Sequence, residues 1–361
     1  PTEVFTITVT DSSSTETDTM TVTITVTGAN DAPSAGSDGT GAVTEDASTS
    51  TATGSITATD DDDAAAFTYS GDATGTYGAI AVDSAGAWTY TLSNSDADTT
   101  ALDAGDSVSD TFTLTVSDGT ASDSMDVVIT VTGADDDVSA GADQTGAVTE
   151  DATATTATGT VAASDADADS SLSYAIGTAA GTYGGLAMSG AAWTYTLDNA
   201  DADTTALDAG DAPTEVFTIT VTDSSSTETD TMTVTITVTG ADDDVSAGAD
   251  QTGAVTEDAT ATTATGTVAA SDADADSSLS YAIGTAAGTY GSLAMSGAAW
   301  TYTLDNTDAD TTSLDTGDAP TEVFTITVTD SSSTETDTMT VTITVTGAND
   351  APSAGSDGTG A

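Results

Sequence analysis

The chain has 361 residues, of which 60 are Asp or Glu and none is Lys, Arg, His or Cys, so its formal net charge is −60. A chain without cationic side chains has nothing to pair with phosphate, which argues against a nucleic-acid partner and against contact with an anionic membrane surface. Catalysis is not expected, because a hydroxyl nucleophile would have only carboxylates to activate it. The self-repulsion of the carboxylates must be relieved from outside the chain, by bound divalent cations, by high salt or by both.

A long strand rich in Thr and Val, followed by an acidic linker, recurs four times. The glycine that ends each copy is Gly28, Gly133, Gly240 or Gly347, at intervals of 105, 107 and 107 residues. An interval of this length suits one β-sandwich domain per repeat. We therefore predict the end of a truncated repeat (residues 1–31), three full repeats (32–136, 137–243 and 244–350) and the start of a further truncated repeat (351–361).

The second full repeat predicts seven short strands and no helix. They are Gly146–Asp151, Ala157–Ser164, Ser171–Gly177, Thr182–Met188, Ala191–Leu197, Thr214–Thr222 and Thr229–Thr239. In the sixth, Phe217, Ile219 and Val221 alternate with Thr, which is typical of a half-buried strand. The predicted fold is all-β, with tandem seven-stranded immunoglobulin-like sandwiches arranged end to end. Disorder is the alternative, because the net charge is high and only 37% of residues are hydrophobic; the regular alternation favours the folded state.

One Trp and one Tyr recur two positions apart in every full repeat. The pairs are Trp88 and Tyr90, Trp193 and Tyr195, and Trp300 and Tyr302. Residues two apart on a strand share a face, so we predict that each pair lies in a core. A carbohydrate-binding aromatic surface is the alternative. A further tyrosine follows Gly-Thr in each repeat and is expected to hold a turn: Tyr77, Tyr183 and Tyr290.

The acidic clusters fall at the ends of the predicted strands, so tandem sandwiches would bring them together at each joint. The first joint would collect Glu45, Asp103, Asp106, Asp135, Asp136, Asp165, Asp167 and Asp223, and the second Glu150, Asp208, Asp211, Asp242, Asp243, Asp272, Asp274 and Asp330; Asp118 is the counterpart of Asp223 in the first repeat. Carboxylates crowd together only around a cation, and oxygen ligands alone favour Ca²⁺. Simple solvation, or adaptation to high salt, is the alternative. An EF-hand is excluded, because Ile176 stands at the twelfth position from Asp165.

The segments GTYGGLAM, AAWTYTL, LDAGD, FTITVTD and VTITVTGANDAP together resemble the VCBS repeat of large bacterial surface proteins, including RTX-type adhesins. The resemblance covers all three full repeats, and the general plan of that family is cadherin-like. The segment DADAD is similar to the cadherin DAD loop, LDAGD to the LDRE motif, VTED to the glutamate of the first strand, and GANDAP to the DxNDNxP linker.

This resemblance implies a set of structural calcium ligands. They are Glu45, Glu150 and Glu257 and Asp103, Asp208 and Asp315 from one domain; Asn30, Asp31, Asn349 and Asp350 from the linkers; and Asp60, Asp62, Asp165, Asp167, Asp272 and Asp274 from the next domain. LDAGD has Gly where the cadherin motif has Glu, so one place later Asp106, Asp211 and Asp318 are expected to substitute. Two of the linkers read DDD with Val in place of Pro, so the number of ions per joint stays open.

The predicted function is that of a structural segment of a long extracellular bacterial repeat protein, an adhesin stalk or surface filament stiffened by calcium at its joints. The expected partners are calcium, and surface glycans or neighbouring copies of the chain. One alternative is a carbohydrate-binding surface module. The other is a laterally packed filament or sheath subunit.

Overall fold

The computed structural model describes residues 1–62, 66–168, 171–275 and 278–352. These residues form strands, turns and connecting segments, and they contain no helix able to cross a membrane. The chain divides into two compact units. The first contains Pro1–Ser139, Ser164–Leu172 and Thr222–Thr229, and the second contains the remainder. Most of the predicted final segment, 351–361, lies outside the described residues.

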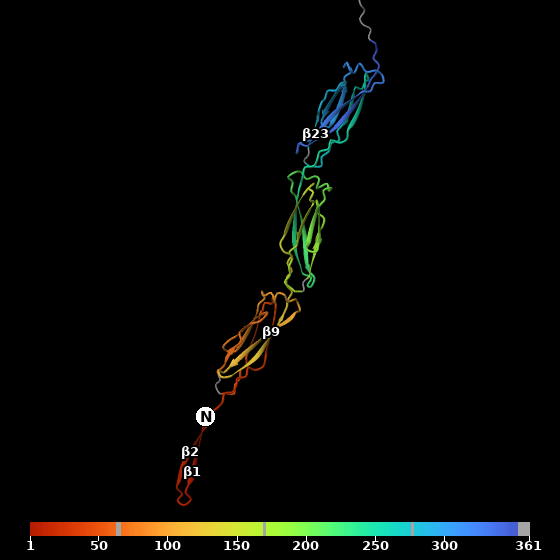
Figure 1. Ribbon diagram of the computed structural model, residues 1–361. Coiled ribbons are helices and arrows are strands. Elements are labelled where there is room, and N and C mark those ends of the chain that lie inside the picture. Colours follow the sequence, from red (N-terminus) through yellow and green to blue (C-terminus); the bar gives the residue numbers. More distant parts are fainter. Residues whose placement is uncertain (63–65, 169–170, 276–277, 353–361) are drawn as a thin grey trace, which may run out of the picture. The chain divides into compact units, whose positions relative to one another are not determined.

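The first unit begins with an antiparallel hairpin of β1 (Thr2–Thr10) and β2 (Thr17–Thr25). The first full repeat follows with β3 (Gly39–Thr44), β4 (Thr51–Ser55), β5 (Thr68–Ser70), β6 (Ala73–Thr74), β7 (Gly78–Val82), β8 (Ala87–Leu92), β9 (Ser107–Ser117) and β10 (Ser122–Thr132). These strands form two sheets, with the orders β3-β10-β9-β5 and β4-β8-β7-β6. The repeat is therefore a sandwich of two layers (Figure 1).

The strands of the second repeat are β11 (Gln144–Thr149), β12 (Thr156–Thr160), β13 (Leu172–Ile176), β14 (Gly184–Ser189), β15 (Ala192–Leu197), β16 (Thr214–Asp223) and β17 (Thr229–Thr239). The third repeat copies them as β18 (Gln251–Thr256), β19 (Thr263–Thr267), β20 (Leu279–Ile283), β21 (Gly291–Ser296), β22 (Ala299–Leu304), β23 (Thr321–Asp330) and β24 (Thr336–Thr346). Each repeat again has two sheets, in the orders β11-β17-β16-β13 and β12-β15-β14 for the second. The prediction of an all-β fold of tandem sandwiches is confirmed. Among the described residues the second and third repeats have the predicted seven strands each, whereas the first repeat has eight, because the short strand β6 pairs with β7.

The first strand of the second repeat begins and ends two residues earlier than predicted. It runs parallel to the last strand, from Gln144 opposite Val234 to Thr149 opposite Thr239. The side chain of Gln144 accepts a hydrogen bond of 2.8 Å from the indole of Trp193, which fixes the start of the strand. The predicted strand residues Glu150 and Asp151 lie instead in the turn that follows.

The cores consist of the apolar faces predicted from the alternation. Trp193 and Tyr195 of one sheet are buried, as are Phe217 and Ile219 of the other. The rings of Tyr195 and Phe217 are tilted against each other with centroids 5.8 Å apart. The prediction that the Trp and Tyr pairs belong to the cores is confirmed, and the Trp side chains are not an exposed aromatic surface.

Each core also contains one buried carboxylate that the sequence analysis missed. In the first repeat Asp110 accepts hydrogen bonds from the hydroxyl of Tyr90 at 2.9 Å and from the backbone N–H groups of Thr76 and Tyr77 at 2.9 and 3.1 Å. Glu215 and Glu322 have the same role in the next two repeats. Burial and the neighbouring carboxylate raise the pKa of the Tyr90 hydroxyl. The acid is therefore held as a hydrogen-bond acceptor in the core.

The hairpin β1–β2 has nearly the sequence of β16–β17, but its apolar residues are exposed. Phe5 is 49% exposed and Met20 is 56% exposed, whereas their counterparts Phe217 and Met232 are 3% and 1% exposed. The difference arises because β16 and β17 pack against a second sheet, while β1 and β2 form a two-stranded sheet on their own.

Candidate metal centre at the linkers

The first linker follows β10 and is fixed by the turn that follows β3. Because β3 and β10 are parallel and end together, the backbone N–H of Glu45 extends the ladder by donating to Thr132 at 2.9 Å. The side chain of Glu45 then turns inward, is only 2% exposed and accepts a hydrogen bond of 3.3 Å from the N–H of Ala134. The strand register therefore places a carboxylate beneath the linker.

The same linker is held from the other side by the acidic loop after β12. Within the first unit, the N–H of Asp136 donates to the carboxylate of Asp167 at 2.8 Å, and the N–H of Asp167 donates to Asp165 at 3.1 Å. The second unit repeats this arrangement, since the N–H of Asp243 donates to Asp274 at 2.8 Å. Each linker thus joins carboxylates from two neighbouring repeats.

The crowding of these groups shifts their pKa values. Burial, with smaller contributions from Asp136, Asp46 and Asp167, raises the pKa of Glu45 to about 7. Burial, with repulsion from Asp136 among others, likewise raises the pKa of Asp167 to about 6. In the second unit burial, with repulsion from Asp243, Asp272 and Asp208, also raises the pKa of Asp274 to about 6. No Lys, Arg or His exists in the chain to offset these charges.

Several carboxylate oxygens at these linkers are buried without a hydrogen-bond donor. They are Oε1 of Glu45, Glu150 and Glu257, Oδ2 of Asp60, Asp136, Asp165 and Asp272, and Oδ1 of Asp274. A buried acceptor without a partner costs about 1–3 kcal/mol, more when it is charged, and oxygen-binding cations such as Ca²⁺ take ligands of this kind. The type of donor, a carboxylate oxygen, therefore suits Ca²⁺, although no three acidic side chains of the described residues are grouped closely enough to hold a metal ion as they stand.

The LDAGD segment contacts the linker through its backbone. The N–H of Gly133 donates to the carbonyl of Asp106 at 3.0 Å, and the N–H of Gly240 donates to that of Asp211 at 3.0 Å. A side chain at Gly133 would overlap the carbonyl oxygen of Asp103. The linker glycine is therefore needed for this close approach, and it brings the acidic segment to the linker.

Asp223 and Asp330 are occupied by their own hairpin turns. The carboxylate of Asp223 accepts hydrogen bonds from the hydroxyls of Ser225 and Ser226 and, at 2.9 Å, from the N–H of Ser226. These bonds hold its pKa well below the usual range. In the first repeat, Asp118 likewise accepts from its own turn and also from the side chain of Asn30 at 2.9 Å.

The linker before the first repeat contacts the loop aspartates of the repeat that follows it, and the linker after the third repeat contacts the buried glutamate of the repeat that precedes it. Before the first repeat, the N–H of Asp31 donates to Asp62 at 2.9 Å, and the N–H of Asp62 donates to Asp60 at 2.8 Å. After the third repeat, Glu257 accepts from the N–H of Ala348 at 3.0 Å. The remaining predicted residues there take part in local contacts: the N–H of Asp315 donates to the carboxylate of Asp318, and the side chain of Asn349 to the carbonyl of Asp350.

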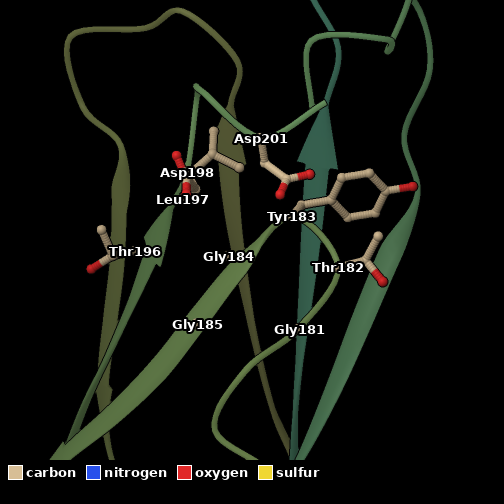
Figure 2. Close-up of a pocket in the computed structure, with 9 residues that line it drawn as sticks. All are labelled: Gly181, Thr182, Tyr183, Gly184, Gly185, Thr196, Leu197, Asp198 and Asp201. Carbon is tan, nitrogen blue, oxygen red and sulfur yellow. The ribbon is translucent and has the colours of Figure 1, made fainter. Parts of the chain in front are cut away.

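A shallow hollow of about 480 Å³ lies on the second repeat, away from the buried Trp. Figure 2 shows the ring of Tyr183 beside the carboxylate of Asp201, with Asp198 beyond it. The matching hollow on the third repeat has about 410 Å³. Both acids cap their own turns, because Asp198 accepts from Ala200 at 3.0 Å and Asp201 from Asp203 at 2.9 Å.

The comparisons with known proteins agree with this architecture. Residues 30–133 match the family model of the bacterial cadherin-like domain. Among solved structures, extracellular cadherin domains 1–5 of protocadherin gamma B2 match with a TM-score of 0.51 and 19% identity, over 97% of this chain and 67% of that one. Domains EC1–4 of Drosophila N-cadherin match with a TM-score of 0.37 and 17% identity, over 95% of this chain and 83% of that one. The EC3–6 cis-dimer structure of protocadherin gammaB7 matches with a TM-score of 0.43 and 17% identity, over 86% of this chain and 72% of that one. No curated protein matches the chain.

The segment 30–133 is thus similar to the bacterial cadherin-like domain. The second and third repeats have the same order of strands in their four-stranded sheets. The fold of the chain is therefore that of cadherin-like β-sandwiches in tandem.

Proposed function

We propose that the chain is a structural segment of a long extracellular protein, either an adhesin stalk or a surface filament, in which calcium at the linkers fixes each repeat to the next. The observation that carries this proposal is the buried glutamate of the turn after each first strand. Glu45, Glu150 and Glu257 are 2%, 3% and 2% exposed, and each has one buried oxygen without a donor. Extracellular calcium is the abundant cation suited to such oxygens.

In the first linker the ion would be held by Glu45, Asp136, Asp165 and Asp167, with the corresponding residues Glu150, Asp243, Asp272 and Asp274 in the second. When bound, the ion supplies positive charge that offsets the repulsion among these carboxylates. The chain supplies the rest: the parallel strand pair positions the glutamate, and the N–H of Asp136 holds the loop aspartate beside it. A linker ordered from both sides would be stiff.

The proposal is tested by comparing the chain with calcium and with a chelator, at about 150 mM salt so that general screening is constant. Calcium is expected to raise the melting temperature and to increase the maximum dimension in small-angle X-ray scattering. The double variant Glu45→Gln and Glu150→Gln should lose most of both effects. Glu3→Gln, in the exposed hairpin strand, is the matched control and should retain them. An unchanged melting temperature and dimension would refute the calcium linkers and favour general salt adaptation.

Glycan binding is a second candidate, favoured by the hollow beside Tyr183. A half-buried aromatic ring flanked by carboxylates is a chemistry that suits sugar hydroxyls and ring faces. Glycan-array screening of the whole chain tests it, and saturable binding that is lost in Tyr183→Ala and Tyr290→Ala would support it. Binding that survives both substitutions would exclude these hollows.

A further inference from the structure

The two glutamines of the chain hold the indole groups of the second and third repeats. The side-chain amide of Gln144 accepts a hydrogen bond of 2.8 Å from the indole N–H of Trp193 and donates one of 2.7 Å to the backbone carbonyl of Thr160. Gln251 makes the same two bonds, with the same lengths, in the third repeat. One primary amide thus satisfies both an indole donor and a carbonyl acceptor.

The first repeat has glycine in place of this glutamine. Gly39 begins β3 as Gln144 begins β11. The indole-bearing residue of the first repeat, Trp88, is also buried, with 3% of its surface exposed. Among the described residues no group accepts a hydrogen bond from the indole N–H of Trp88. An indole N–H buried in this way ordinarily has an acceptor.

The backbone carbonyl of Ser55 lacks the donor that its counterpart has. The N–H of Ile56 donates across the sheet to the carbonyl of Gly86 at 2.9 Å, and backbone groups alternate in direction along a strand. The carbonyl of Ser55 therefore points away from β8, as that of Thr160 points away from β15. No side chain in the described ranges donates to the Ser55 carbonyl, whereas a glutamine donates to Thr160.

Both groups border a hollow of about 550 Å³ on the first repeat, which Gly39, Ser55 and Trp88 line. The hollow therefore offers one N–H donor and one carbonyl acceptor. Asp38 lines it as well and adds a negative charge. This combination favours a neutral group that carries an acceptor and a donor together, and it disfavours a carboxylate.

We propose that this hollow binds a primary carboxamide, whose oxygen accepts from the indole of Trp88 and whose N–H group donates to the carbonyl of Ser55. The first repeat would take from outside the group that the other two repeats supply from their own chain. A small free amide and the glutamine side chain of another polypeptide both carry this chemistry. The site is separate from the linkers and does not depend on calcium.

The test is an NMR titration of the whole isotope-labelled chain, whose three Trp residues give three indole N–H signals. Propionamide should shift the Trp88 signal saturably in the millimolar range, the weak affinity expected of so small a probe. The other two indole signals should stay in place. Propionate and N,N-dimethylpropionamide, which lack the amide N–H donor, should leave all three unmoved. The absence of a saturable shift up to about 200 mM propionamide, or an equal shift with the dimethyl probe, would overturn the proposal.

Reciprocal substitutions locate the site. Gly39→Gln supplies the amide from the chain, so it should abolish the response of Trp88 to propionamide. Gln144→Gly should create the same response at the indole of the second repeat. A Cβ atom at Gly39 would lie 3.1 Å from the flexible end of Met125, so the fold should be retained. Thr19→Gln, in the exposed strand β2, is the matched control and should leave the response unchanged. A response that survives Gly39→Gln would overturn the proposal.

A second probe, N-acetylglutamine N-methylamide, distinguishes the two sources of the amide. Binding at least as tight as that of propionamide would identify a glutamine side chain of another polypeptide as the ligand. Weaker binding would identify a small free amide. Both results support a carboxamide site, provided that propionamide itself binds.

Discussion

The hydroxyl of Tyr195 donates a hydrogen bond of 2.5 Å to the carboxylate of Glu215, and both side chains are buried in the core of the second repeat. The same carboxylate accepts from the N–H of Tyr183 at 2.9 Å and from that of Thr182. One acid thereby connects the two sheets to the loop before β14. Its burial is tolerated because three donors replace water.

Glu215→Ala should lower the free energy of unfolding by about 2–4 kcal/mol, because two backbone N–H groups and one hydroxyl lose their acceptor. The measurement is urea denaturation followed by Trp fluorescence. Glu3→Ala is the matched control, since Glu3 holds the same place in the sequence motif but is exposed in β1. Equal effects of the two substitutions would contradict the structural role of Glu215.

Gly181→Ala should also be destabilising, by about 1–3 kcal/mol, because a Cβ atom at this position would overlap the carboxylate of Glu215. The carboxylate would have to move away from its donors. Gly28→Ala provides the control, as nothing lies within 4 Å of a Cβ there. Thermal denaturation of the two variants under the same conditions gives the comparison.

Without calcium, the protein should become less stable as the pH rises from about 4 to about 7. The folded pKa values of Glu45 and Asp167, about 7 and 6, exceed the unfolded values of 4.5 and 3.8, so the folded state binds more protons and loses stability as they dissociate. The lowered pKa values of Asp223 and Asp330 act only at lower pH. Melting temperatures across this range in chelator should fall, whereas saturating calcium should flatten or reverse the trend. A rise with pH in chelator would be inconsistent with these shifts.

Asp223→Ala should lower the melting temperature but leave calcium affinity unchanged. The carboxylate caps the turn between β16 and β17 through Ser225 and Ser226 and has little capacity left for an ion. Calorimetric titration with calcium measures the second effect directly. A large loss of affinity would instead return Asp223 to the ligand set predicted from the sequence.

The sequence was sufficient to predict the sandwich because its strands follow a strict period of two. Phe217, Ile219 and Val221 could be assigned to one face from the alternation alone, and the structure buries all three. Glu215 lies two positions earlier on the same face, but a charged residue is not expected in a core, so its burial was not predicted. The tyrosine that donates to it recurs two residues after each Trp, and this pairing could have indicated the buried acid.

The sequence could place the acidic residues at the linkers, because they are concentrated where strands end; their binding of a metal ion stays a prediction. Their individual roles could not be predicted. Asp151 owes its position to a left-handed turn, which a pattern of residue types does not record. The pattern likewise does not show that the carboxylate of Asp223 accepts hydrogen bonds from Ser226 of its own turn; its role as a metal ligand stays a prediction.

The parallel pairing of first and last strands determines how a repeat would respond to being pulled. The chain enters β11 at Gln144 and leaves β17 beyond Thr239, at opposite ends of a ladder of six residue pairs. Tension along the chain would therefore shear the whole ladder at once, so its hydrogen bonds would resist together. In the antiparallel hairpin β1–β2, by contrast, the outer ends Thr2 and Thr25 are neighbours, and the same force would peel the pairs apart one after another.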